Sequence, residues 1–131
     1  MTQKTKTKIE KPLTEVELQM MNAIWDLGEC TVKEVQVLLS KEKELAYTSV
    51  ATIMKILEQK GFLRSTKNDR AHTYISLITR QEYEKTSLKH LAKNVFKDDP
   101  SSMVMRLLND SKLSQEELQK IQKILDERLR S

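Results

Sequence analysis

The chain has 131 residues, 38% of them hydrophobic and 32% charged, with a net charge of +4. This length allows one domain, or one domain with an appendage, and the composition is that of a soluble globular protein. Because the sequence contains two glycines and one cysteine, it excludes a glycine-rich phosphate loop, an internal disulfide and a cysteine-rich metal site. No apolar run approaches the roughly 20 residues that span a bilayer, and the N-terminal segment lacks the apolar stretch of a signal peptide. We therefore expect a small cytoplasmic protein that does not insert into membranes.

The positive charge is unevenly distributed along the chain. Residues 1–11 contain four lysines and one glutamate, and we expect a disordered basic tail there. Residues 12–42 are acidic overall, whereas residues 43–80 contain seven basic and three acidic residues. Such a basic segment suggests a surface for nucleic acid, but charge alone does not separate this from a solvated surface with uneven charge.

Helix starts are marked by capping boxes. In each box a serine or threonine side chain can accept a hydrogen bond from the backbone N–H three residues later. The glutamate at that later position can in turn accept a hydrogen bond from the backbone N–H of the serine or threonine. The four boxes begin at Thr14, Thr31, Thr79 and Ser114. A further start is predicted at Asp99, because Pro100 follows it at the first helical position.

Three helices are predicted before residue 61. The first runs to about Leu27, where Gly28 can end it, and the second makes about two turns. In the third, apolar residues share one face, and Gly61 fits the left-handed position just past its end. The residues that form this apolar face are Val50, Ile53, Met54 and Leu57.

The period of the pattern changes after Gly61. Residues 62–66 and 71–77 are rich in β-branched and aromatic residues and flank the segment 67–70, which contains two basic residues. Asn and Asp in that segment tolerate tight turns, so we predict a hairpin with a basic tip. Three helices followed by a hairpin form a winged helix-turn-helix domain, which we place at residues 12–78.

Residues 79–131 contain three further helical patterns, each with an apolar stripe. These helices could fold back onto the winged helix or pair with a second copy of the chain. We favour a homodimer, because so few residues bury too little surface alone. The fold class is therefore predicted as mainly α with a small β-hairpin, a winged helix-turn-helix domain followed by an α-helical dimerisation region. The residues expected to form the dimer contact are Leu107, Leu118, Ile121 and Leu125.

The third helix carries the most specific functional signal. Residues 45–57 contain one charge, Lys55, and no acid, whereas a solvated helix surface more often displays Glu and Lys pairs. Short hydroxyl side chains, a methyl group and one lysine suit a helix that enters the major groove of double-stranded DNA. The predicted DNA-binding residues of this helix and the hairpin are Thr48, Ser49, Ala51, Thr52, Lys55, Lys67, Arg70 and His72.

Few residues could carry other chemistry. A metal site needs clustered ligands, and His72, His90 and Cys30 lie far apart in the sequence. Cys30 precedes a helix N-terminus, which could lower the pKa of its thiol, although packing is the simpler role for it. The sequence therefore predicts no enzyme, no metal site and no cofactor.

Several short motifs follow one another in a fixed order between Leu13 and Leu129. They are Leu13-Thr14-x-x-Glu17, Ile24-Trp25, Thr31-x-x-Glu34-Val35, Thr48-Ser49-Val50-x-Thr52, Leu57-x-x-Lys60-Gly61, Tyr74 and Leu113-Ser114-x-x-Glu117-Leu118. Each is ordinary alone, but their order and spacing together resemble the penicillinase repressor family, the BlaI and MecI type that also includes copper-responsive repressors. The resemblance implies a homodimeric bacterial repressor that binds inverted-repeat operators through the third helix and the wing. Carried over by position, Thr48, Ser49 and Thr52 meet the operator, and the C-terminal helices dimerise.

The sequence departs from the family's patterns at three places. The β-lactam-responsive members are inactivated by a membrane sensor protease that cleaves an Asn-Phe bond, and the matching positions here are Arg106-Leu107. The copper-responsive members have paired cysteine motifs near the C-terminus, where this chain has no cysteine. Ile56 stands where many relatives have arginine. The inducing signal is therefore not predicted from the resemblance.

An alternative from another class is a winged-helix adaptor that binds a protein and never touches DNA. Such an adaptor should show an exposed apolar patch on the third helix. The absence of acidic residues between positions 45 and 57 favours DNA instead, and so does the basic hairpin.

Overall fold

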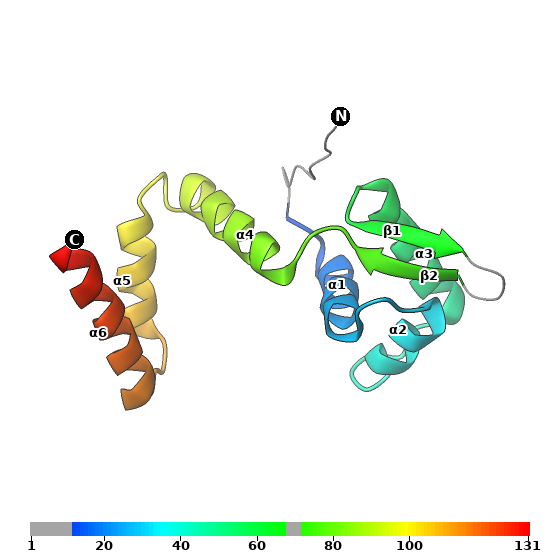
Figure 1. Cartoon of the computed structure of the whole chain (residues 1–131), viewed down its shortest axis with the longest axis horizontal. Helices are drawn as coiled ribbons and strands as arrows, with labels where there is room; N and C mark the ends of the chain where they lie inside the picture. Colours follow the sequence, from blue (N-terminus) through cyan, green and yellow to red (C-terminus); the bar gives the residue numbers. More distant parts are fainter. Residues whose placement is uncertain (1–11, 68–71) are drawn as a thin grey trace. The chain divides into compact units, whose positions relative to one another are not determined.

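The computed structural model describes residues 12–67 and 72–131. Within these residues the chain forms six helices and one antiparallel hairpin (Figure 1), which confirms the prediction of a mainly α fold with a small β-hairpin. The elements are α1 (Glu15–Leu27), α2 (Val32–Leu39), α3 (Tyr47–Gln59), β1 (Leu63–Lys67), β2 (His72–Ser76), α4 (Arg80–Asn94), α5 (Pro100–Asp110) and α6 (Gln115–Arg130).

Local sequence signals account for the ends of these helices. All four predicted capping boxes form, at α1, α2, α4 and α6. Asp99 accepts a hydrogen bond from the backbone of Ser102 at the start of α5, with Pro100 at the first helical position. Gly28, at φ 81°, and Gly61, at φ 90°, follow α1 and α3 in backbone conformations that residues with a side chain rarely adopt.

One hydrophobic core joins α1, α2, α3 and the hairpin. Its largest fully buried side chains come from each of these helices and from β1: Met20, Met21, Ile24, Val35, Val50, Met54, Leu57 and Leu63. Leu18 and Ile53 are partly buried and pack against this core. Packing of this kind places α3 with one face inside the domain and the other in solvent.

The hairpin is joined to the helices through its second strand. Its register pairs Leu63 with Ser76 at one end and Lys67 with His72 at the other. Cys30, between α1 and α2, exchanges two backbone hydrogen bonds with Tyr74, of 3.0 and 2.7 Å. The wing is thereby fixed to the turn between the first two helices.

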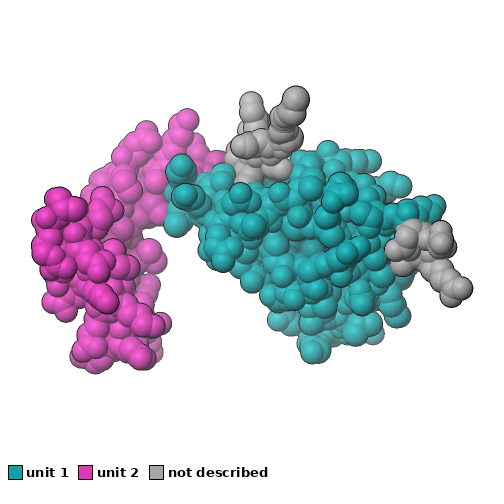
Figure 2. Space-filling model, in the orientation of Figure 1, with its two compact units in different colours: residues 1–89 teal, residues 90–131 magenta. Residues whose placement is uncertain are grey.

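The chain divides into two compact units, residues 1–89 and 90–131 (Figure 2). This division lies inside α4, beyond the boundary at residues 78 and 79 that the sequence suggested. The reason is Tyr83, which is buried in the first unit with its ring centroid 5.8 Å from that of Trp25 and 6.3 Å from that of Phe62. Among the residues described, no helix combines the length and the apolar character that a membrane crossing requires.

Candidate nucleic-acid interface

The outer face of α3 has the composition that the sequence predicted. Thr48, Ser49, Thr52 and Lys55 are exposed, opposite the buried side chains of the same helix. Ala51 is partly buried and packs against the core, so it lies at the edge of this face. The face presents hydroxyl groups and one ammonium group, which can donate hydrogen bonds to base edges and phosphates.

The N-terminus of α3 differs from those of the other helices. Ala46 precedes the helix, and within the described residues no side chain caps its first turn, which also contains no acid. The uncapped N–H groups and the positive end of the helix dipole favour a phosphate there. This feature was not among the sequence predictions, although the absence of Ser, Thr, Asp or Asn directly before Tyr47 indicates it.

The wing presents two of its predicted residues at the far end of the hairpin. Lys67 and His72 are exposed and face each other across the two strands. The His72 ring lies 4.9 Å from the Tyr74 ring, measured between centroids. Arg70 lies outside the described residues. The described part of the wing thus offers one lysine and one histidine beside the hairpin turn.

Two carboxylates hold the wing in place by accepting hydrogen bonds from its hydroxyl groups. Glu29 accepts from Thr73 at 2.7 Å and from Thr66 at 3.3 Å. Glu58 of α3 accepts from Ser65 of β1 at 2.6 Å. The wing is therefore attached to α3 directly, and the one acid of α3 is engaged with the hairpin. No local motif points to a role for these two glutamates, because the partners of Glu29 are 37 and 44 residues away and Ser65 lies in a different element from Glu58.

Cys30 is a packing residue. Its side chain is buried, and burial raises the pKa of the thiol to about 11, with the charges of Glu34 and Glu29 adding to the effect. The lowered pKa that a position before a helix N-terminus could produce is not found, because burial and the charges of Glu34 and Glu29 all act to raise the pKa of this thiol. In the described residues, no group of three His, Cys, Asp or Glu side chains is placed to hold a metal ion.

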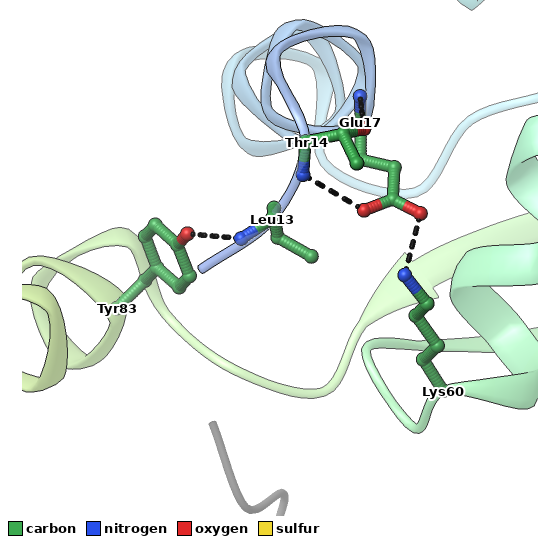
Figure 3. Close-up of polar contacts among 5 residues, drawn as sticks. All are labelled: Leu13, Thr14, Glu17, Lys60 and Tyr83. Atoms are coloured by element: carbon green, nitrogen blue, oxygen red, sulfur yellow. Dashed lines mark hydrogen bonds and ion pairs between the residues drawn. The ribbon is translucent and has the colours of Figure 1, made fainter. Parts of the chain in front are cut away.

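A polar network joins the first and third helices (Figure 3). Glu17 caps α1 by accepting a hydrogen bond from the backbone N–H of Thr14 at 3.0 Å, and its other oxygen accepts from Lys60 Nζ at 2.7 Å. Burial acts to raise the pKa of Glu17, but the hydrogen bonds and charge of Lys60 and the bonds from Thr14 outweigh it and leave the pKa lowered. Lys60 directly follows α3, so this ion pair ties the end of α3 to the start of α1.

We expect Glu17→Gln to weaken the acid dependence of stability. Because the pKa of Glu17 lies below 4.5 in the folded chain, its carboxylate stabilises the fold above that pH, and this contribution is lost as the pH falls through the folded pKa. Urea unfolding at several pH values should show a free energy of unfolding that falls less steeply in acid. At pH 7 the loss should be about 0.5–1 kcal/mol, because Lys60 is half-exposed and Gln can still form the capping box.

Glu15→Gln is the matched control for this experiment. Glu15 lies in the same first turn but is exposed. If the acid dependence of the free energy of unfolding weakens equally in both variants, the effect does not come from the pairing of Glu17 with Lys60.

The residues predicted for dimerisation lie in the second unit, on α5 and α6. Leu107, Leu118 and Leu125 are 56%, 40% and 49% exposed, and Ile121 is partly buried. In the described chain, α6 has no buried residue, although Ser114 and Glu117 form a capping box at its start. A helix with a persistent apolar stripe and no buried side chain has a face that the described chain leaves uncovered.

Comparison with known proteins identifies the family. The sequence model described as "Penicillinase repressor" matches residues 13–127. The chain belongs to the penicillinase repressor family. One relative, the penicillinase repressor of Bacillus licheniformis, is 27% identical over 115 residues, which are 88% of this chain and 90% of the relative. The methicillin resistance regulatory protein MecI of Staphylococcus aureus (strain N315) is 22% identical over 116 residues, which are 88% of this chain and 94% of MecI.

A solved structure has a similar fold. It is the solution structure of the Bacillus licheniformis BlaI monomeric form in complex with the blaP half-operator. The match has a TM-score of 0.50 and 29% identity, and it covers 58% of this chain and 92% of the BlaI chain. The resemblance inferred from the motifs and the winged-helix fold are thereby confirmed.

Two departures from the family pattern can now be placed on the structure. Ile56 is 37% exposed on α3. Arg106 and Leu107 are exposed in α5, where Arg106 forms an ion pair with Asp110 at 3.6 Å.

Proposed function

We propose that this chain is a transcriptional repressor that binds an inverted-repeat operator as a homodimer. The observation that carries the proposal is the outer face of α3. That face is exposed, has hydroxyl groups and one lysine but no free acid, and lies next to a hairpin that is fixed to α3 by the Glu58–Ser65 hydrogen bond. Membership of the penicillinase repressor family and the similarity to BlaI bound to a half-operator support it.

In this proposal α3 enters the major groove. Its exposed side chains, Thr48, Ser49, Thr52 and Lys55, contact base edges and phosphates, with Ala51 close to the bases at the edge of the face. The uncapped N-terminus of α3 receives a backbone phosphate. In the wing, Lys67, Arg70 and His72 contact the phosphates beside the groove, which position the domain without reading sequence.

The second unit supplies the dimer contact. One recognition helix covers only a few base pairs, and two copies read half-sites whose centres lie about 10–10.5 base pairs apart or a multiple of that. Exposed leucines on α5 and α6 support a contact with a second copy, because an apolar stripe of this kind needs cover. We assign residues 79–131 to dimerisation, with the first turns of α4 packed on the DNA-binding unit.

The remaining parts of the proposal follow from this role. A repressor must have access to the bacterial DNA, so we place the protein in the cytoplasm. The proposed role requires neither enzymatic activity nor a cofactor. The basic residues 1–11 add non-specific attraction to DNA.

The adaptor alternative predicts an exposed apolar patch on α3. Tyr47 and Ile56 are the large apolar side chains exposed on that helix, at 50% and 37%. They are nine positions apart, about two and a half helical turns, so they point to opposite sides of the polar face. No apolar patch forms on the described face of α3, and DNA remains the better partner.

The proposal is tested by measuring binding to DNA from upstream of the protein's own gene and its neighbours. We expect one segment with an inverted repeat to bind at least 10³-fold more tightly than scrambled DNA of equal length at physiological salt. Affinity for both should fall as salt rises. Equal affinity for all sequences, or no binding at low salt, would contradict the proposal.

We expect Lys67→Gln to weaken binding to operator and scrambled DNA alike. If Lys67 neutralises one phosphate, its loss lowers the slope of log affinity against log salt by about 0.9 for each bound protomer. Fluorescence anisotropy over a salt series measures the slope. Lys123→Gln removes the same charge from α6, and we expect it to leave the slope unchanged; a wild-type slope in Lys67→Gln would remove the wing from the interface.

A further inference from the structure

The first turns of α4 are attached to both ends of α1. At one end, Arg80 donates hydrogen bonds to the Asp26 carboxylate at 2.9 Å and to the backbone oxygen of Asn22 at 3.2 Å. Its guanidinium also lies over the Trp25 ring, 5.4 Å from the centroid. Arg80 therefore holds the start of α4 against the C-terminal half of α1.

The other attachment is made by Tyr83. Its hydroxyl accepts a buried hydrogen bond of 2.9 Å from the backbone N–H of Leu13, just before α1 begins (Figure 3). Arg80 and Tyr83 are three residues apart, so they lie on the same side of α4. The partner of Tyr83 is Leu13, just before α1, whereas the partners of Arg80 are Asn22 and Asp26, nine and thirteen residues further along the chain. Two attachments so far apart determine the direction of one helix on another.

The network continues from α1 to the recognition helix. Glu17 lies in the first turn of α1 and pairs with Lys60 directly after α3, at 2.7 Å. The start of α1 is therefore bound on one side to α4, through Leu13 and Tyr83, and on the other to α3 (Figure 3). A continuous set of contacts within the first unit thus fixes the first turns of α4, residues 80–89, relative to α3.

That direction matters because α4 is the helix through which the chain leaves the DNA-binding unit. Residues 80–89 belong to the first unit, and the same helix continues to Asn94 in the second. We propose that Arg80 and Tyr83 are positioning residues that set the preferred spacing between operator half-sites, by holding α4 in one direction on the DNA-binding unit. This inference rests on the proposed function as a dimeric repressor.

The test uses Tyr83→Phe in the full chain. This change removes the hydroxyl but keeps the ring that packs against Trp25 and Phe62. Binding is measured to a single half-site and to inverted repeats whose half-sites are moved apart or together by one and two base pairs. We expect half-site affinity to stay within about twofold of the wild type, because no DNA-contacting group is altered. The preference for the best spacing should fall about tenfold, since a buried N–H loses its partner and α4 is no longer held.

Arg80→Met is the second variant and removes the other attachment while keeping an apolar stem over Trp25. It should reduce the preference for one half-site spacing in the same way; the affinity as a function of this spacing is called the spacing profile below. Thr86→Ala is the matched control, because in the described part of the chain the Thr86 hydroxyl bonds the backbone of Glu82 within the same helix. Its preference for half-site spacing should be that of the wild type. Thermal unfolding of each variant verifies that the DNA-binding unit is folded.

The outcomes separate this inference from the proposed function. If the wild type binds an inverted repeat tightly and both variants keep its spacing profile, the positioning role is wrong while the repressor function stands. A proportional loss on the half-site and on every repeat also overturns it, because the two residues would then only stabilise the unit. If the wild type binds neither DNA, the proposed function fails and this inference fails with it.

Discussion

Leu118→Asp should convert the protein into a folded monomer that has lost tight operator binding. The Leu118 side chain is 40% exposed on the apolar stripe of α6. In a two-fold dimer the substitution places an unpaired charge in the interface twice, and each uncompensated buried charge costs about 3–5 kcal/mol. The DNA-binding unit has its own core and should remain folded. Analytical ultracentrifugation, circular dichroism and operator binding measure the three parts of this prediction.

Leu125→Asp should have the same effect, because Leu125 lies two turns along the same stripe and is 49% exposed. Lys123→Gln is the matched control: it lowers the net charge by one unit, as the aspartate variants do, but lies on the other side of α6. We expect it to stay dimeric. An aspartate variant that remains a dimer would show that these stripes pack within one chain. A monomer that binds the operator as tightly as the wild type would remove the dimer from recognition.

Thr52→Ala should reduce discrimination between operator and scrambled DNA. Thr52 is exposed in the middle of the outer face of α3, where a hydroxyl can bond a base edge and a methyl group can contact thymine. Loss of one such contact should weaken operator binding by about 1–3 kcal/mol and leave non-specific binding nearly unchanged. Titrations of both DNAs at one salt concentration give the difference directly.

Thr52→Ser retains the hydroxyl and should keep most of the discrimination that Thr52→Ala loses. If alanine instead weakens binding to operator and scrambled DNA equally, Thr52 contacts the phosphates and only positions α3. If alanine has no effect on either DNA, the outer face of α3 does not read the operator at this residue.

Features set by neighbouring residues were predictable from the sequence. A capping box is complete within four residues, so Thr14 with Glu17 and Ser114 with Glu117 announce helix starts before any tertiary contact is known. The spacing of apolar residues in α3 likewise defines its buried face, and with it the exposed face that we propose for DNA. The change after Gly61 from a helical period to segments rich in β-branched and aromatic residues predicted the hairpin.

Features made by residues far apart in the sequence were decided only by the tertiary structure. Glu17 has a motif role as a cap, but nothing in the sequence pairs it with Lys60. The sequence placed Tyr83 in the dimerisation region, residues 79–131. In the structure its ring packs in the core of the first unit, and its hydroxyl accepts a hydrogen bond from the backbone just before α1. The pKa of Cys30 is raised because folding buries it near two carboxylates. Local motifs determine where the elements of this protein begin and end, because their hydrogen bonds close within one turn; burial and long-range pairing determine which of them act as one unit, because these depend on which surfaces meet in space.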